Sequence, residues 1–288
     1  MKKKGDFGYV NLTVPAPGGL NQLSDKLVYA EVEGKRFTTT KKTLSYEHIP
    51  QITYFPEASL KLARIDLKTE GKRIAYLPGA GDKIPEALKM AGYEVDILSE
   101  SSIMQANLGI YEAIVTGVRL YNTNPRVSML EDRLLDYVKE GGTLLVQYNV
   151  RNGLQTTDIG PYPFTISNSR VTNENSKVTF LAREHPVLNY PNKITEADFD
   201  GWIQERGLYF LDNIDQHYTP VLSMNDPGEQ PHNGSLIVTD FGKGRFVYTS
   251  LSFFRQLPAG VPGAYRLFIN LITKTKRNNE NETTGRGN

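Results

Sequence analysis

A glycine-rich turn is the first part of this sequence that could bind a ligand. Gly79, Gly81 and Asp82 follow an apolar run at residues 74–77 and precede a helical pattern. Backbone N–H groups in such a turn can hold an anion at the start of a helix. Position 84 is Ile, so the spacing is not that of a dinucleotide fingerprint, and it is not that of a P-loop. The turn either lines a ligand site or is a tight turn in which Asp82 caps the helix.

Polar and aromatic residues also follow two further predicted strands, at residues 113–116 and 143–147. Parallel strands end at one edge of a sheet, so we expect these side chains to emerge beside the glycine-rich turn. Polar groups that converge beside aromatic rings suit a sugar or another small polar ligand. They can equally tie the loops together through hydrogen bonds. The residues concerned are Arg119, Tyr121, Asn122, Gln147, Tyr148 and Asn149.

An acidic and aromatic segment at residues 198–209 holds the only Trp, Trp202, together with Asp200, Glu205 and Arg206. A carboxylate pair of the glycosidase type needs a defined spatial separation, which spacing along the chain does not supply. A Trp among charges also suits carbohydrate stacking or a packed loop. We therefore add Trp202, Glu205 and Arg206 to the predicted ligand site, with Arg255 from a later loop.

The sequence lacks the residues that several kinds of chemistry require. The chain has no Cys, which excludes disulfides, thiolate metal sites and a cysteine nucleophile. The four His residues have no zinc-motif spacing, and no Ser lies in a G-x-S-x-G elbow. We predict no catalytic residue, no metal site and no cofactor. A net charge of +1 gives no electrostatic case for nucleic acid, and no apolar run is long enough to span a membrane.

The pattern of elements changes near residue 70. Residues 1–70 are β-rich, with runs that alternate like strands, and residues 71–276 alternate strands with helices. This rhythm predicts an α/β domain with a mostly parallel sheet and helices on both faces. Residues 150–232 form a long, weakly structured insertion, and residues 277–288 are predicted to be a disordered tail. The predicted strands are 9–14, 27–32, 36–40, 52–55, 60–67, 74–77, 93–98, 113–116, 143–148, 178–181, 235–239 and 245–249, and the helices are 84–91, 129–140 and 264–274.

Motifs from residue 72 to 273 carry a family resemblance. Among them are Tyr76-Leu-Pro-Gly-Ala-Gly-Asp82, Ala113-Ile-Val-Thr-Gly-Val-Arg119, Glu184-His-Pro-Val-Leu188 and Phe199-Asp-Gly-Trp-Ile-Gln-Glu-Arg-Gly-Leu-Tyr209, with further stretches at 136–143, 160–164 and 251–263. The region resembles the class I glutamine amidotransferase-like domain at the C-terminus of bacterial PIG-L/LmbE deacetylase-family proteins, which are common in Bacteroidetes-type genomes. It is also more distantly similar to ThuA-like proteins, in the turn at 185–186 and at residues 242–249.

The resemblance implies a flavodoxin-like sheet and a link to carbohydrate metabolism, but not glutaminase activity. Amidotransferases of this class use a Cys on a strand-to-helix elbow. By the order of elements the elbow falls near Tyr148 and Asn149, neither of which can form the thioester. The zinc-binding region of a deacetylase domain would lie upstream and is not in this sequence.

The leading hypothesis is a non-catalytic accessory domain that binds a carbohydrate-type ligand or packs against a deacetylase domain of the same protein or operon. One alternative is a sugar-active enzyme that uses Asp200 or Glu205 as acid or base. Another is a structural domain that mediates assembly. The compartment is left open: periplasmic or secreted if the chain is part of a longer exported protein, and otherwise cytoplasmic.

Overall fold

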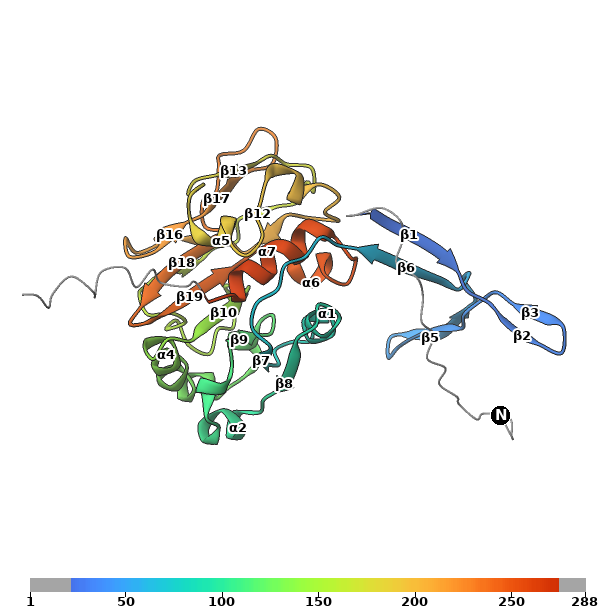
Figure 1. The fold of residues 1–288 in the computed structure, drawn as a ribbon, viewed down its shortest axis with the longest axis horizontal. Helices are drawn as coiled ribbons and strands as arrows, with labels where there is room; N and C mark the ends of the chain where they lie inside the picture. The colour runs from blue at the N-terminus through green and yellow to red at the C-terminus, as the bar shows by residue number, and fades with distance from the viewer. Residues whose placement is uncertain (1–21, 275–288) are drawn as a thin grey trace, which may run out of the picture. The chain divides into compact units, whose positions relative to one another are not determined.

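The computed structural model describes residues 22–274. The chain forms two compact units that divide between Asp66 and Leu67, close to the boundary predicted at residue 70 (Figure 1). The strand predicted at 9–14 and the tail predicted at 277–288 lie outside the described residues. We describe each unit by itself.

The first unit consists of antiparallel strand pairs. A turn through Glu33 and Gly34, both with positive φ, joins the second and third strands, as the sequence signal predicts. Large apolar side chains such as Phe37 and Phe55 are exposed, and none of the described side chains of this unit is buried. The pairs are β1 (Gln22–Leu27) with β6 (Ser59–Arg64), β2 (Ala30–Val32) with β3 (Lys35–Phe37), and β4 (Lys42–Tyr46) with β5 (Ile49–Tyr54).

A seven-stranded sheet forms the centre of the second unit, in the order β16-β18-β19-β10-β9-β7-β8. Five neighbouring strands are parallel, and along the chain they follow the order 2-1-3-4-5 of a flavodoxin-like sheet. This confirms the predicted fold class. The parallel strands are β7 (Arg73–Leu77), β8 (Glu94–Ile97), β9 (Ala113–Thr116), β10 (Thr143–Gln147) and β19 (Gly244–Thr249), and the antiparallel ones are β18 (Leu236–Phe241) and β16 (Thr219–Pro220).

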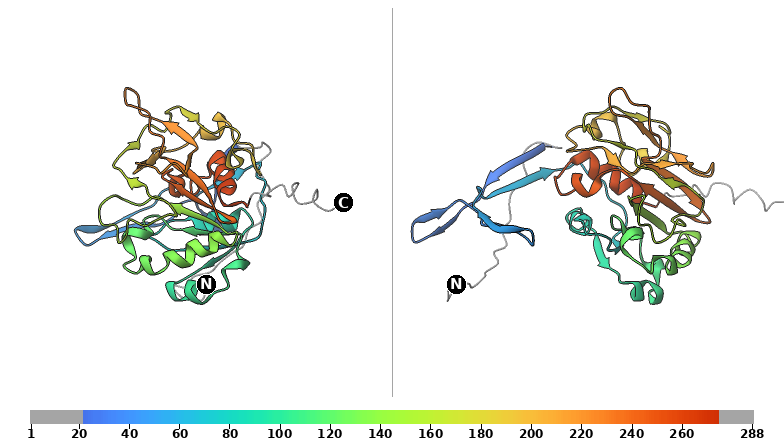
Figure 2. Two further views of the ribbon diagram at one scale, coloured as in Figure 1. Left: turned by 90° about the vertical axis from the view of Figure 1, so that its left-hand side faces the viewer. Right: turned by 180° about the vertical axis from the view of Figure 1, so that it is seen from behind.

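Helices cover both faces of this sheet. The three longest described helices are the predicted ones, α1 (Ile84–Met90), α4 (Glu131–Lys139) and α7 (Pro262–Ile272), and Figure 2 shows α4 and α7 on opposite sides of the sheet. The sequence patterns did not reveal the shorter turns. These are α2 (Glu100–Gln105), α3 (Leu120–Thr123), α5 (Pro186–Asn189) and α6 (Phe253–Gln256), with 3-10 turns at Leu108–Ile110, Val127–Met129 and Glu196–Phe199.

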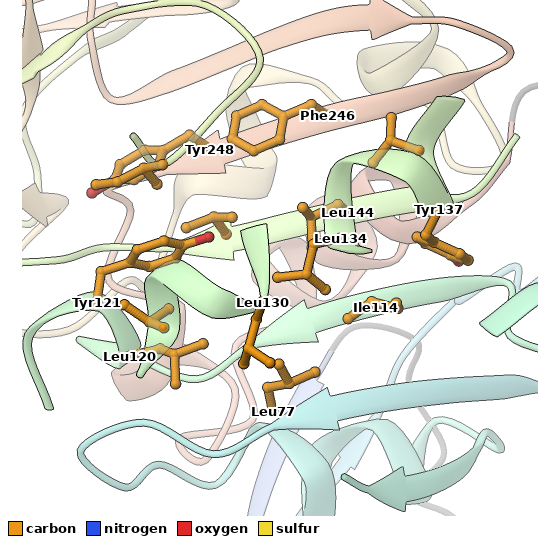
Figure 3. Packing of buried hydrophobic residues seen from close by; sticks show 14 of the residues in the cluster. Leu77, Ile114, Leu120, Tyr121, Leu130, Leu134, Tyr137, Leu144, Phe246 and Tyr248 are labelled. Atoms are coloured by element: carbon orange, nitrogen blue, oxygen red, sulfur yellow. The ribbon is translucent and has the colours of Figure 1, made fainter. Parts of the chain in front are cut away.

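One large hydrophobic cluster of the core lies where the sheet meets α4. Leu144 of β10 packs near Leu134 of α4 (Figure 3), and Val146 and Val138 belong to the same cluster. All five residues of β10 are buried. A parallel strand that is covered on both faces has apolar side chains on both, so its sequence is a continuous apolar run. This is why β10 and its neighbours were recognisable from the sequence alone.

The insertion at residues 150–232 is built from small antiparallel pairs. These are β11 (Thr165–Ile166) with β15 (Leu211–Asp212), β12 (Arg170–Val171) with β14 (Gly207–Leu208), and β13 (Val178–Phe180) with β17 (Leu222–Met224), of which β13 was predicted. Asn192 anchors the insertion to the sheet domain. Its amide donates to the Lys68 carbonyl, and its backbone N–H donates to the buried Asn270 side chain of α7.

Candidate functional site

The glycine-rich turn after β7 is bonded to the turn after β9. Ala80 N donates to the Val118 carbonyl, and a Cβ placed on Gly79 would lie 2.2 Å from that same oxygen. Asp82 accepts from Val118 N and from Ile84 N, at 3.0 Å each. Asp82 thus accepts a hydrogen bond from the first helical residue, but the N-cap position belongs to Lys83, one residue later than predicted. We call this turn a structural joint, because its hydrogen bonds connect the end of β7 to the turn after β9 and to the start of α1.

The backbone is strained at Arg119, which directly follows that second turn. Arg119 has φ 59° and ψ 25°, in the left-handed region, and stands between β9 and α3. This conformation costs a non-glycine residue about 1–2 kcal/mol, so the surrounding structure must impose it. The resemblance had placed a strand-to-helix elbow near Tyr148 and Asn149. Neither of these has a positive φ, and the turn with elbow geometry is formed at Arg119 instead.

The side chain of Arg119 lacks a hydrogen-bonding partner among the described residues. It is half-buried, its Nε is inaccessible to solvent, and its guanidinium makes no hydrogen bond or ion pair within residues 22–274. A guanidinium carries five N–H donors, and leaving one buried and unsatisfied costs free energy. Arg119 is therefore the group at this edge of the sheet that most needs an acceptor.

Tyr148 lies beside Arg119 at the carboxyl end of β10. The Arg119 backbone N–H donates to the Tyr148 carbonyl at 2.8 Å, and the two side chains interact electrostatically. Burial raises the pKa of the Tyr148 hydroxyl, and Glu205 and Tyr209 raise it further, whereas Arg119 and Arg255 oppose the shift. The hydroxyl therefore remains protonated at neutral pH and can donate a hydrogen bond.

Two aromatic rings and an ion pair lie beside Tyr148. The Tyr148 ring is stacked with Tyr209 at a centroid distance of 6.3 Å and contacts Phe254 at 5.1 Å. Arg255 Nε donates to Glu205 Oε1 at 2.7 Å, and only 12% of the Glu205 side chain is exposed. We call the following residues the strand-end cluster: Arg119, Tyr148, Glu205, Tyr209, Phe254 and Arg255.

Bonds to the end of β19 hold the segment that carries Glu205 and Tyr209. The Ser252 hydroxyl donates to the Glu205 carbonyl at 2.7 Å, and Leu208 N donates to the Ser250 carbonyl at 3.0 Å. Tyr209 has φ 57°, a second left-handed residue in this cluster. The insertion thus brings its own side chains to the strand ends in a fixed geometry.

Three residues predicted to line the ligand site serve the scaffold instead. Asn149 is fully buried, and its side chain accepts from Tyr121 N and donates to the Gln147 carbonyl. The Asn122 side chain bonds both backbone groups of Val150. Tyr121 is packed in the core (Figure 3). For Asn122 and Asn149 the loop-tying interpretation is the one that the contacts support.

Trp202 and Arg206 also lie away from the strand-end cluster. Trp202 is 3% exposed, is stacked on Phe199 at 5.4 Å and donates its indole N–H to the Asp198 carbonyl. Arg206 is buried and donates to the Ser176 and Phe199 carbonyls, and burial lowers its pKa to about 10. Trp202 also contacts Phe253, and its burial favours the packed-loop interpretation that the sequence left open over carbohydrate stacking.

The two carboxylates of the enzyme hypothesis are differently placed. Glu205 belongs to the strand-end cluster, where it is paired with Arg255. Asp200 is exposed and interacts electrostatically with Arg206, outside the cluster. The enzyme hypothesis therefore retains one carboxylate at the site, held in an ion pair.

Sequence reasoning missed Tyr209, Phe254 and Glu131. The two rings lie within motifs that carry the resemblance, but nothing in the sequence indicated which way they point. Glu131 is the first residue of α4, a position where an acidic residue ordinarily faces solvent and favours the helix dipole. Here one carboxylate oxygen is buried without a hydrogen-bond partner, and burial raises the pKa of Glu131 to about 7.

Two further observations bear on the kinds of site that are present. In the described part of the chain, no group of three or more His, Asp or Glu side chains is arranged to hold a metal ion. No helix between residues 22 and 274 is long and apolar enough to cross a membrane.

Comparisons with known proteins give structural matches only. No protein-family model and no curated protein matches the sequence. One similar solved structure is a cytoplasmic protein from Salmonella typhimurium, with a TM-score of 0.44 and 12% identity over 88% of this chain and 96% of that one. A second is PurLQS from Thermotoga maritima, with a TM-score of 0.48 and 13% identity over 70% of this chain and 98% of that one. A third is a Thermoplasma acidophilum protein described as a subunit of a GMP synthase, with a TM-score of 0.43 and 10% identity over 70% of this chain and 94% of that one. Likeness at this level says nothing about what the chain binds or catalyses.

Proposed function

We propose that the second unit is a non-catalytic, amidotransferase-like domain that binds a carbohydrate-type ligand at the strand-end cluster. The observation that carries the proposal is the unpaired, half-buried guanidinium of Arg119 beside the Tyr148 hydroxyl. A ligand with hydroxyl and acidic groups supplies the acceptors that these donors lack. The rings of Tyr209 and Phe254 add apolar surface of the kind on which the faces of sugar rings pack.

The residue types at the elbow support a binding role over catalysis. Arg119 occupies the left-handed position between strand and helix, and a permanently protonated guanidinium is not a nucleophile. The sequence has no Cys to form a thioester anywhere. In line with the resemblance to PIG-L/LmbE proteins, the domain would hold a ligand beside a deacetylase domain of the same protein or operon.

A glycan array followed by calorimetry tests this proposal. We expect saturable binding of at least one sugar by the full chain, and a loss of affinity of about tenfold or more in Arg119→Ala. Arg126→Ala is the matched control, because Arg126 lies just beyond α3 with 74% of its side chain exposed. Trp202→Ala is unsuitable as a probe, since it would open a cavity in the packed loop.

Two results would count against the proposal. One is an array without a saturable hit, and the other is a sugar that binds Arg119→Ala and the wild-type chain equally well. Loss of binding in Arg126→Ala as well would show that the effect is general electrostatic attraction and not a site at Arg119.

Assembly is a second candidate function, favoured by the first unit. Its exposed apolar side chains include Leu27, Tyr29, Phe37, Tyr46 and Phe55, each at least 48% exposed. A two-stranded ribbon also leaves backbone N–H and C=O groups unpaired along its edges, and another strand can pair with them. We propose that these strands pair with a second copy of the chain.

Light scattering on the full chain tests self-assembly. We expect a mass above that of one 32.3 kDa chain, which falls to one chain in a Phe37→Ser and Phe55→Ser double variant. Met90→Ser with Met129→Ser is the control, because both methionines are exposed on the second unit. A single-chain mass at all concentrations would rule out self-assembly.

A further inference from the structure

A pocket of about 410 Å³ lies in the insertion, and no residue of the strand-end cluster lines it. One part of its wall comes from the loop after β10, at Arg151, Leu154 and Ile159. The other comes from the β11–β15 pair, at Phe164 and Asp212. Volumes of this size are typical of small-molecule sites in proteins.

Apolar side chains form the inner surface of this pocket. Ile159 and Ile166 are both buried and belong to the core of the sheet domain. Phe164 packs edge to face on Tyr248, whose strand is at the centre of the sheet, at a centroid distance of 5.1 Å. Because these residues are part of the core, the apolar surface is fixed before any ligand arrives.

The pocket also presents one cation and one anion, Arg151 and Asp212. Both residues are exposed, and among residues 22–274 neither side chain makes a hydrogen bond or an ion pair, so the two charges are solvated and are not paired with each other. Asp212 is held in place through its backbone, because its carbonyl accepts from the Thr165 hydroxyl at 2.9 Å. The Arg151 loop is fixed by the Asn122 amide, which donates to the carbonyls of Val150 and Asn152.

We infer that this pocket is a second binding site, for a small zwitterion with an apolar body. Arg151 would pair with the carboxylate of such a ligand and Asp212 with its ammonium group. The aliphatic or aromatic body would pack on Phe164, Ile159 and Ile166. A neutral polyol would leave both charges unpaired and cover the apolar surface poorly, and a simple anion or cation would meet a like charge on one side.

Titration of the full chain with four probes tests this inference. L-leucine and 6-aminohexanoate are zwitterions that differ in the separation of their charges, and hexanoate and hexylamine each keep only one charge. We expect at least one zwitterion to bind, to shift the methyl resonances of Ile159 and Ile166, and to exceed both single-charge probes about tenfold in affinity. Arg151→Gln and Asp212→Asn should each weaken that zwitterion about tenfold or more.

Arg170→Gln is the matched control, because Arg170 lies on β12 of the same insertion and does not line this pocket. The inference is overturned if neither zwitterion binds, if hexanoate or hexylamine binds as tightly, or if Arg151→Gln and Asp212→Asn behave like the wild-type chain. Loss of sugar binding in Arg119→Ala is a separate result, since Arg119 does not line this pocket.

Discussion

The Oδ2 atom of Asp82 lies 3.0 Å from the backbone nitrogen of Val118 and accepts its hydrogen bond. One carboxylate thereby joins the turn after β7 to the turn after β9, and its other oxygen serves Ile84 at the start of α1. Burial and the Asp82 carboxylate together raise the pKa of the neighbouring Tyr76 hydroxyl above its usual range, so Tyr76 stays protonated and can donate to that carboxylate. Arg119, whose backbone is strained, directly follows Val118 in the chain.

Asp82→Ala should lower the free energy of unfolding by about 1–3 kcal/mol, because the N–H groups of Val118 and Ile84 lose a charged acceptor. Urea unfolding measures the change. Asp132→Ala, at an exposed position in the first turn of α4, should change the free energy by less than about 0.5 kcal/mol. Equal effects of the two substitutions would show that the joint contributes nothing to stability.

Gly79→Ala should be more damaging than Gly81→Ala. A Cβ at Gly79 meets backbone, 2.2 Å from the Val118 oxygen, so we expect a cost of about 2 kcal/mol or more. A Cβ at Gly81 meets no atom within 4 Å, and only its φ of +104° opposes the substitution, at about 1 kcal/mol. Thermal unfolding of the two variants gives the order, and the reverse order would mean that the two turns are not packed together.

Arg119→Gly should keep or raise stability while it abolishes ligand binding. Glycine has no Cβ penalty at φ 59°, which offsets the larger entropy of the unfolded chain, and the net gain should be up to about 1 kcal/mol. Arg119→Val should destabilise the chain, since a β-branched residue fits the left-handed region poorly. If Arg119→Gly is clearly less stable than the wild-type chain, the side chain has a structural role and is not held for a ligand.

The fold could be predicted because its signals are local. Residues 74–77 are a continuous apolar run, and β9 and β10 have apolar centres at residues 113–115 and 144–146, as is typical of strands covered on both faces. The hairpin of β18 and β19 was recognisable from the glycines at residues 242 and 244. What these signals do not contain is the partner of the last strand: β19 lies beside β10, about 100 positions earlier in the chain, and no local pattern specifies that contact.

The site was predicted only in part, because side-chain direction is not a local property. Arg119, Tyr148, Glu205 and Arg255 were predicted from their positions after strands and in loops, and they do come together. Trp202 was included because an indole ring can stack on a sugar, but its ring packs against Phe199 and Phe253 in the protein interior. Tyr209 and Phe254 reach the cluster from segments far apart in the sequence, and neither position has a pattern that reveals it.

Glu131→Gln should remove part of the pH dependence of stability. The folded state raises the pKa of Glu131 from 4.5 to about 7, through burial first and the nearby Asp158 and Asp132 charges second. The folded protein therefore keeps this proton to higher pH than the unfolded chain does, and stability falls as pH rises from about 4.5 to 7. The variant cannot lose a proton, so it should match the wild-type chain at pH 4.5 and exceed it at pH 8 by about 1 kcal/mol, after discounting for partial exposure.

Urea midpoints at several pH values measure this difference. Glu140→Gln is the matched control, because Glu140 is exposed at the C-terminal end of the same helix and its charge is not among those that raise the pKa of Glu131. A difference between Glu131→Gln and the wild-type chain that is the same at pH 4.5 and pH 8 would contradict the prediction, since it would not come from ionisation.

The position of β19 in the sheet has a consequence for the chain during synthesis. While the ribosome has made only the first 240 residues, β10 is an open edge, because the strand that covers it at residues 244–249 does not yet exist. Asn270, which bonds Asn192 in the insertion, is made later still. The sheet therefore closes only after nearly all of the described chain has been translated. Until then the nascent chain presents an open strand edge with the apolar residues 144–146 at its centre, and this is the interval in which we expect chaperones to be needed.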